Sequence, residues 1–367
     1  MSYRVPSKDY GKQNAELWPE LSAEIERVFR EENPVLGESV AAFEREFASH
    51  LGVQHVVGVG TGTDALVLSL RAVGVLPGDE VITAANTFAA TITAIALVGA
   101  RPVLVDPDPR TLTIDAEGVE QAMGEAIKVV IPVHLYGRLC DMEPLMELCY
   151  DRGVAIVEDA AQAHGANGVR QAGAFGKAGC FSFHPSKNLG AFGDGGAIAT
   201  DDVTIAKTLR ELRNLGKRTK YEFAHVSPNT KLDTLQAAVL RVKLRHLDRW
   251  NARRREIAGL YTASLNTVLE TPVEAAHGQH VFHLYAAHLD RRDELRRHLK
   301  ESGINAGVHY PTPPHLQPWH TGMGYRPGDF PVAEASAARE LSLPVSPELS
   351  DEQVAFVCER IHAFFAS

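Results

Sequence analysis

The 367-residue sequence predicts an α/β fold, in which a large three-layer αβα domain with a mainly parallel sheet precedes a smaller C-terminal α+β domain. Between residues 55 and 157, short continuous apolar runs alternate with helical patterns of roughly 10 to 15 residues. Continuous apolar strands are typical of a parallel sheet covered by helices on both faces. From Gln279 onward the pattern changes to alternating strands and charged helices. A chain of this length can bury two sizeable cores.

The composition indicates a soluble, cytoplasmic protein without nucleic-acid or membrane partners. Apolar residues make up 45% of the chain and charged residues 23%, with a formal net charge of −9. The basic clusters Arg253–Arg255 and Arg291–Arg292 are interpreted as solvated helix faces. The longest apolar stretch, Phe88 to Ala100, is too short to span a bilayer. The cysteines at 140, 149, 180 and 358 form no CxxC pair, so we expect reduced thiols. We expect no metal site.

The elements follow from apolar spacing and stop signals. Two amphipathic helices come first, Trp18 to Glu31, which Asn33-Pro34 ends, and Val40 to Leu51. Alternating strands and helices follow, and ligands in such sheets bind beyond the carboxyl ends of the strands. The predicted strands are His55–Val59, Glu80–Thr83, Pro102–Val105, Lys128–Val133 and Val154–Val157, and the helices between them cover Leu66–Val73, Ala89–Val98, Ala116–Met123 and Met142–Arg152.

A glycine-rich stretch, Gly179 to Ala197, follows this alternation. Strands are predicted on both sides of it, and long helices and then the C-terminal elements come after it. The chain therefore divides into an N-terminal helix and arm (1–35), a large domain (36–247) and a small C-terminal domain (248–367). The remaining predicted strands are Cys180–Phe183, Ala197–Ala199, His280–Leu289 and Asn305–Val308, and the remaining helices are Val203–Leu215, Leu232–Leu247, Arg249–Leu265, Arg292–Ser302 and two that begin at Val332 and Asp351.

Lys187 is the most unusual residue of the glycine-rich stretch. It follows Pro185 and precedes glycines at 190, 193, 195 and 196. Glycine is used where the backbone bends sharply or approaches another group closely. An arbitrary lysine is usually solvated, whereas this one is predicted to lie on a tight loop at the end of a strand.

The turn Gly60-Thr61-Gly62-Thr63-Asp64 joins a strand to a helix. Its two glycines expose backbone amides beside two hydroxyls at a helix N-terminus, where an anion such as phosphate is favoured. The same turn could cap the helix without any ligand. Its function therefore depends on the residues that it meets in the fold.

Asp159 ends a buried strand, and small residues follow it. A carboxylate in a low-dielectric site needs a partner, and a protonated heteroaromatic nitrogen is one; a helix N-cap is the alternative. Gln162 could bond a second polar atom of the same ring, and Phe88 could stack on it or be an ordinary core aromatic. With Lys187 and the glycine turn, these residues match the groups that hold pyridoxal phosphate.

Four ordered motifs carry a family resemblance across nearly the whole chain. The motifs are Thr61-Gly-Thr-Asp-Ala-Leu66, Thr87-Phe-Ala-Ala-Thr91, Glu158-Asp-Ala-Ala-Gln-Ala-His-Gly165 and Phe181-Ser-Phe-His-Pro-Ser-Lys-Asn-Leu-Gly190, and Leu232–Ala238 and Gly307–Gln317 extend the resemblance. With these motifs the chain resembles the DegT-type sugar aminotransferases, which are fold type I enzymes that use pyridoxal 5′-phosphate.

The resemblance implies a role for each candidate residue. Lys187 should bind the cofactor aldehyde as a Schiff base and act as the catalytic base, and Asp159 should pair with the pyridinium nitrogen. Gln162 should contact the ring hydroxyl and Phe88 should stack on the ring. The phosphate should be held by Gly62, Thr63, Ser182 and, from the neighbouring subunit of a homodimer with shared active sites, Asn229. The family's Gly-Tyr-Asn-Ser-Arg is Ser227-Pro-Asn-Thr-Lys231 here, and Lys cannot make the bidentate contact of Arg.

The resemblance also implies the reaction. We expect transfer of an amino group from L-glutamate to a nucleotide-linked keto sugar, a dTDP-3-keto-6-deoxyhexose, which gives a 3-amino-deoxysugar. The candidate substrate contacts are His309, Tyr310, His184, Tyr221 and His315. Amination at C4, or of a cyclitol, is the alternative within the same chemistry. A catalytically silent regulatory protein that binds pyridoxal phosphate is the alternative from another class.

Overall fold

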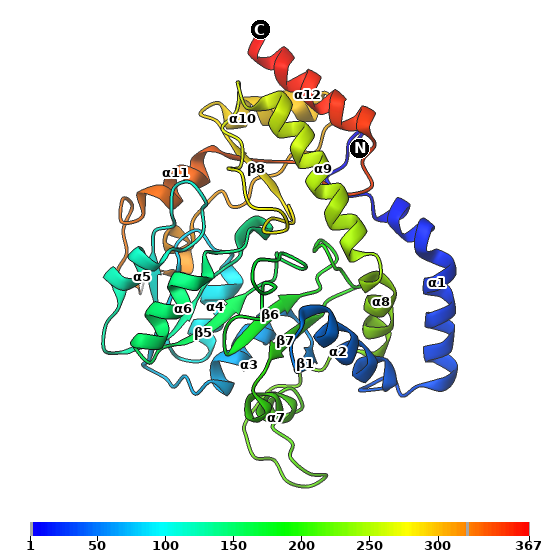
Figure 1. Ribbon diagram of the computed structural model, residues 1–367, viewed down its shortest axis with the longest axis vertical. Helices are drawn as coiled ribbons and strands as arrows, with labels where there is room; N and C mark the ends of the chain where they lie inside the picture. The colour runs from blue at the N-terminus through cyan, green and yellow to red at the C-terminus, as the bar shows by residue number, and fades with distance from the viewer. Residues whose placement is uncertain (1–2, 321–322, 367) are drawn as a thin grey trace.

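The computed structural model describes residues 3–320 and 323–366, which form a central sheet between two helical layers and a smaller unit packed at one end (Figure 1). The sheet has seven strands in the order β1-β7-β6-β5-β4-β2-β3. Only β7 runs antiparallel to its neighbours, β1 and β6. The predicted α/β class with a mainly parallel sheet is therefore confirmed. The strands are β1 (His55–Val59), β2 (Glu80–Ala84), β3 (Arg101–Val105), β4 (Ile127–Ile131), β5 (Ala155–Asp159), β6 (Ala178–Ser182) and β7 (Gly196–Thr200).

Helices cover both faces because successive residues of a strand point to opposite sides. Val57 and Val157 pack with α3, α4 and α7 on one face. On the other face, Val56 packs with α2 and α8, and Ile156 packs with α5 and α6. The three layers therefore arise from one alternation within each strand. The helices are α1 (Tyr10–Glu31), α2 (Glu38–Leu51), α3 (Gly62–Ala72), α4 (Ala89–Leu97), α5 (Ala116–Ala122), α6 (Met142–Asp151), α7 (Val203–Leu212) and α8 (Thr234–Leu244).

The smaller unit is built on an antiparallel pair of strands, β8 (Tyr285–His288) and β9 (Glu340–Leu343). The helix α9 joins the two units: its first residue packs with α2 and α8, and its second half packs on β8 and β9. The remaining helices are α9 (Leu247–Leu265), α10 (Arg292–Glu301), α11 (Pro331–Arg339) and α12 (Asp351–Ala366). Short 3-10 turns occupy Leu135–Gly137, Pro314–Leu316 and Pro318–His320.

One strand prediction was wrong. The segment 305–308 is not a strand, because only Gly307 pairs, through a single bridge to Ser342. The strand beside β8 is β9, which lies more than fifty residues further along the chain. Such a pairing depends on tertiary packing and leaves no local signal. Within the described residues, no helix is long and apolar enough to cross a bilayer.

Candidate active site

A cavity of about 680 Å³ lies where the carboxyl ends of β1, β5 and β6 meet the smaller unit. Its walls come from the N-terminal arm, the large unit and the small unit. Most of the predicted site residues line this cavity, namely Gly62, Thr63, Phe88, Asp159, Gln162, Ser182, His184, Lys187, His309 and Tyr310. The fold thus brings together residues that are up to 248 positions apart in the sequence, counting from Gly62 to Tyr310.

The turn after β1 forms the floor at one end of the cavity. Thr61 is the N-cap of α3, and its Oγ1 accepts a hydrogen bond from the Asp64 amide at 2.9 Å. The amides of Gly62 and Thr63 have no acceptor among the residues described. A Cβ at Gly62 would lie 2.6 Å from Ser182 Cβ, so only glycine fits there. Two free amides at a helix N-terminus beside a serine hydroxyl suit a phosphate group.

Asp159 is buried at the end of β5 and is held by two hydrogen bonds. Its Oδ2 accepts from Thr91 Oγ1 at 2.8 Å, and its Oδ1 accepts from the Ala161 amide at 3.1 Å. The next regular element after β5 is β6, so the carboxylate caps no helix. It is an oriented acceptor on the cavity wall, which is what a ring N–H requires.

Gln162, Tyr310 and Phe88 form one connected group. Gln162 Oε1 accepts from the Tyr136 amide at 2.7 Å, and Nε2 donates to the Tyr310 hydroxyl at 3.1 Å. The Tyr310 ring lies 5.1 Å from the Phe88 ring. Phe88 is 48% exposed, so it is not an ordinary core aromatic, and part of its ring surface is open to a ligand.

Lys187 lies on the loop after β6, where its amide donates to the His184 carbonyl at 2.8 Å. Within the described chain its Nζ makes no hydrogen bond and no ion pair, although the side chain is partly buried. Burial lowers the pKa of Lys187 to about 8, and the Asp159 carboxylate opposes this shift. The cavity therefore holds a free amine that is partly neutral at neutral pH.

His309 and His184 lie at different depths. His309 Nδ1 pairs with Ser342 Oγ at 2.8 Å, and burial lowers the pKa of His309 to about 4. It is therefore neutral at pH 7 and can contribute hydrogen bonds but no charge. His184 is exposed, and its Nδ1 pairs with Ser186 Oγ at 2.9 Å.

Three candidate residues do not line this cavity. His315 is buried elsewhere, where its Nε2 pairs with Glu334 at 3.0 Å and its ring packs against Phe330. Tyr221 and Asn229 lie on the segment after α7 that extends from the molecule below α7 in Figure 1. Both side chains are exposed, and neither is among the residues that line the cavity.

This geometry agrees with a comparison against known families, in which the DegT/DnrJ/EryC1/StrS aminotransferase family model matches residues 17–362. The chain belongs to this family. The predicted resemblance is thereby confirmed, and so is the expectation of an aminotransferase enzyme.

Relatives and solved structures of the family cover nearly the whole chain. A dTDP-3-amino-3,4,6-trideoxy-α-D-glucose transaminase from Streptomyces venezuelae is 44% identical over 98% of this chain and 95% of that protein. A protein from Geobacillus stearothermophilus called a pleiotropic regulatory protein is 45% identical over 98% of both chains. The crystal structure of S. venezuelae DesV in complex with a ketimine intermediate has a TM-score of 0.96 at 43% identity, over 99% of both chains.

The family uses pyridoxal phosphate, and its solved members include a PLP form. That structure, a putative sugar aminotransferase from Streptococcus pneumoniae, has a TM-score of 0.88 at 26% identity and covers 94% of this chain and 95% of its own. The likeness extends to the sheet and to both units, since nearly all of this chain is matched.

Sequence reasoning missed several residues of the cavity. Lys8 comes from the N-terminal arm, and Arg254 and His283 come from α9 and the segment before β8. The solvated-face interpretation was wrong for Arg254 and Arg292, which are 3% and 9% exposed. Arg254 lies on the helix side that faces the cavity, whereas Arg253 pairs with Asp351 at the surface. Tyr136 lies behind the cavity wall, where its amide binds Gln162, and it follows the end of β4, so the rule of carboxyl strand ends could have found it.

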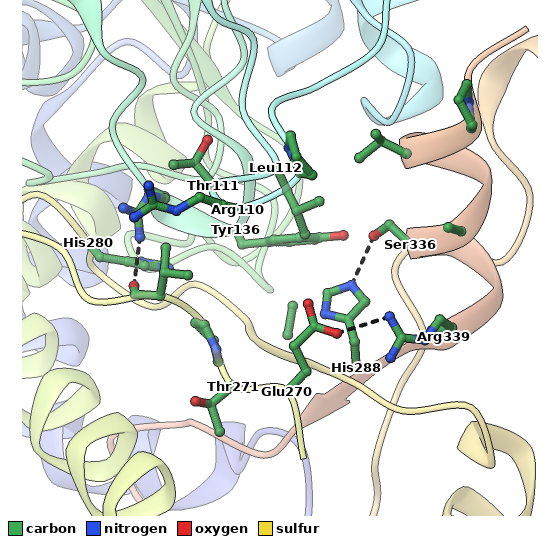
Figure 2. A pocket seen from close by; sticks show the side chains of 18 residues that line it. Arg110, Thr111, Leu112, Tyr136, Glu270, Thr271, His280, His288, Ser336 and Arg339 are labelled. Atoms are coloured by element: carbon green, nitrogen blue, oxygen red, sulfur yellow. Dashed lines mark hydrogen bonds and ion pairs between the residues drawn. The ribbon is translucent and has the colours of Figure 1, made fainter. Parts of the chain in front are cut away.

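A second cavity of about 400 Å³ lies behind Tyr136 (Figure 2). Its polar groups bond to one another: His288 Nε2 meets Ser336 Oγ at 3.0 Å, and Glu270 pairs with Arg339 at 2.9 Å. None of the described residues that line it is a lysine, so it lacks the amine that the first cavity holds. Tyr136 connects the two, because its amide binds Gln162 and its hydroxyl donates to the His309 carbonyl at 2.6 Å.

Proposed function

We propose that this enzyme transfers an amino group from L-glutamate to C3 of a nucleotide-linked keto-deoxyhexose, with dTDP as the nucleotide, and uses pyridoxal 5′-phosphate. The observation that carries the proposal is the unpaired amine of Lys187, in one cavity with the free amides of α3 and with Asp159. The S. venezuelae transaminase, a 3-amino-sugar enzyme by name, supports the substrate class and the position.

The residues of the cavity fit this cofactor. The amides of Gly62 and Thr63 and the hydroxyl of Ser182 would hold its phosphate, in a space that a side chain at 62 would fill. Asp159 would accept a hydrogen bond from the ring nitrogen, and Phe88 would lie against the ring. Bound pyridoxal phosphate supplies an aldehyde that takes up an amino group and a ring that withdraws electrons from the adjoining carbon.

Lys187 is the group that moves protons. Its Nζ would hold the aldehyde carbon between turnovers and be released when the donor's amine takes its place. The free Nζ then removes the proton from the donor's α-carbon, and in the second half reaction it delivers a proton to C3 of the sugar. Because burial lowers the pKa of Lys187 to about 8, its amine can both take up and release a proton near neutral pH.

Two residues orient the reacting groups. Asp159, fixed by Thr91 and Ala161, would keep the proton on the ring nitrogen throughout both half reactions. His309, neutral and anchored to Ser342, would contact the sugar by hydrogen bonding. Tyr310, which is bonded to Gln162, is the second candidate contact for the sugar.

The assembly that we propose is a homodimer with shared sites. The segment from Gly216 to Asn229 exposes Tyr221 at 82%, Phe223 at 58% and Val226 at 94%, which is apolar surface that a second copy would cover. Lys231 Nζ donates to Asn229 Oδ1, which leaves the amide NH₂ of Asn229 as a donor for the neighbouring phosphate. The Lys at position 231 would thus orient Asn229 instead of contacting the phosphate.

The test is an assay of the purified protein loaded with pyridoxal phosphate. We expect ¹⁵N from labelled glutamate to appear on C3 of a dTDP-3-keto-6-deoxyhexose, read by NMR of the product. Lys187→Ala, which keeps the cavity but lacks the amine, should transfer none. Label on C4 would show that the sugar is aminated at C4 and not at C3. Transfer only to a cyclitol ketone would show that the acceptor is a cyclitol and not a nucleotide-linked sugar. Cofactor binding without transfer to any keto sugar would overturn the proposal in favour of a regulatory protein.

A further inference from the structure

Three basic side chains of the active-site cavity form no ion pair with a described residue. Lys8, Lys187 and Arg254 all line it, and among the described residues none of them makes an ion pair. Buried cations are otherwise almost always paired, because charge is costly to remove from water. The amine of Lys187 has a role in the chemistry, which leaves Lys8 and Arg254 to be explained.

Arg254 is held in place without being neutralised. It is 3% exposed, and its Nη1 donates to the carbonyls of Phe282 at 3.2 Å and Val345 at 3.3 Å. Its Nε has no partner in the described chain. Burial lowers the pKa of Arg254 to about 10, so the guanidinium remains charged at neutral pH. The guanidinium is therefore a positive charge in a fixed position, and some of its N–H groups remain free to donate hydrogen bonds.

Lys8 is fixed by backbone pairing of the N-terminal arm. Val5 is fully buried, its amide donates to the Gly303 carbonyl at 3.0 Å, and its carbonyl accepts from Asn305 at 2.9 Å. The Lys8 Nζ lies 3.5 Å from the Lys187 carbonyl. Burial, and next the charge of Arg254, lower the pKa of Lys8 well below its usual value.

The surroundings supply only part of the matching negative charge. Glu348 is the acidic residue that acts on Lys8 and Arg254, but it forms no ion pair with either, and its carboxylate accepts from Gln13 at 2.8 Å and from Ser346. His283 is neutral: its Nδ1 donates to Asn188 Oδ1 at 3.2 Å, and burial and the nearby basic groups lower its pKa. One carboxylate therefore faces two basic side chains, and a second anion in this part of the cavity would balance them.

We infer that Lys8 and Arg254 form the subsite that binds a carboxylate of the amino donor. The inference rests on the proposed function, in which an amino acid with two carboxylates and a nucleotide-linked keto sugar react in turn at Lys187. A carboxylate matches the fork of an arginine and the point charge of a lysine. The diphosphate of the nucleotide-linked sugar is attached at C1, away from the reacting C3, whereas a carboxylate of the donor is attached to the reacting carbon itself. Lys8 lies beside Lys187, so we assign these two basic groups to the donor half reaction and not to the sugar half reaction.

The experiment compares Lys8→Gln with Lys12→Gln. Both remove one positive charge from the same segment, but Lys12 is exposed, donates to the Glu348 carbonyl and does not line the cavity. For Lys8→Gln we expect the glutamate concentration that gives half the maximal donor half-reaction rate to rise by about tenfold or more. For Lys12→Gln it should stay within about twofold of wild type.

Two further measurements separate a donor subsite from a structural role. Lys8→Gln loaded with pyridoxamine phosphate should react with the keto sugar at the wild-type rate. Glutarate, a dicarboxylate without an amine, should bind the wild-type holoenzyme in calorimetry and bind Lys8→Gln about tenfold more weakly. Arg254→Lys keeps the charge but loses the fork, and it should weaken glutarate less than Lys8→Gln does.

Either of two results would overturn the inference: an unchanged glutamate dependence in Lys8→Gln, or an equal loss in both half reactions. A wild-type enzyme that transfers no amino group would instead overturn the proposed function. The glutarate titration would still decide whether the two cations bind a carboxylate, so the two failures are distinguishable.

Discussion

Gly62→Ala tests whether the turn before α3 holds the cofactor phosphate. On the native backbone the added Cβ would lie 2.6 Å from Ser182 Cβ, 3.1 Å from its Cα and 3.2 Å from its Oγ. Carbon atoms in contact are normally about 3.5–4.0 Å apart, so the helix start and Ser182 must separate by about 1 Å. Overpacking of this kind costs about 1–3 kcal/mol.

This movement displaces the start of α3 and Ser182, which are the groups expected to hold the phosphate. If the bound state carries the full cost, the affinity for pyridoxal phosphate falls by about five- to 150-fold. The assay is an absorbance titration of the cofactor-free protein with pyridoxal phosphate, and thermal unfolding checks that the variant is folded. The matched control is Gly259→Ala in α9, whose Cβ meets nothing within 4 Å. Unchanged affinity in a folded Gly62→Ala protein would refute the phosphate assignment.

Three further predictions test Lys187, the shared site and the buried carboxylate of Glu158 on β5. The rate at which Lys187 captures pyridoxal phosphate should rise with pH and level off above its pKa of about 8, since only the neutral amine reacts; stopped-flow absorbance that still rises at about pH 10, near the pKa of an ordinary lysine, would contradict this. Mixed chains of Lys187→Ala and Asn229→Ala, each nearly inactive alone, should regain about a quarter of wild-type transfer, because half of the dimers then carry one intact site; no gain on mixing would exclude shared sites. Glu158→Gln should lower the free energy of unfolding by about 3–5 kcal/mol in urea denaturation, because this buried carboxylate accepts three backbone N–H groups at 2.7 Å and an amide NH₂ cannot; a loss below about 1 kcal/mol would contradict it.

Local patterns were sufficient for the elements of the central sheet. The first strand begins and ends as predicted, and the strand predicted at Glu80–Thr83 continues only one residue further. Strands buried on both faces leave a continuous apolar run, which is a strong local signal. The first helix begins earlier than predicted, at Tyr10, because Asp9 caps it by accepting from the Lys12 amide at 2.9 Å. The domain boundaries at 35 and 247 stay predictions.

The sequence by itself determined the family and the groups that carry the chemistry, because Gly62, Asp159 and Lys187 lie at or shortly after strand ends, and parallel strands bring those ends together. Only the tertiary structure decided which charges are buried beside them. Arg253 and Arg254 are neighbours in one basic cluster, yet the first pairs with Asp351 at the surface and the second lies in the cavity. Spacing along a helix gives a direction for each side chain, but burial depends on what packs against that side, and here the packing partners come from remote segments.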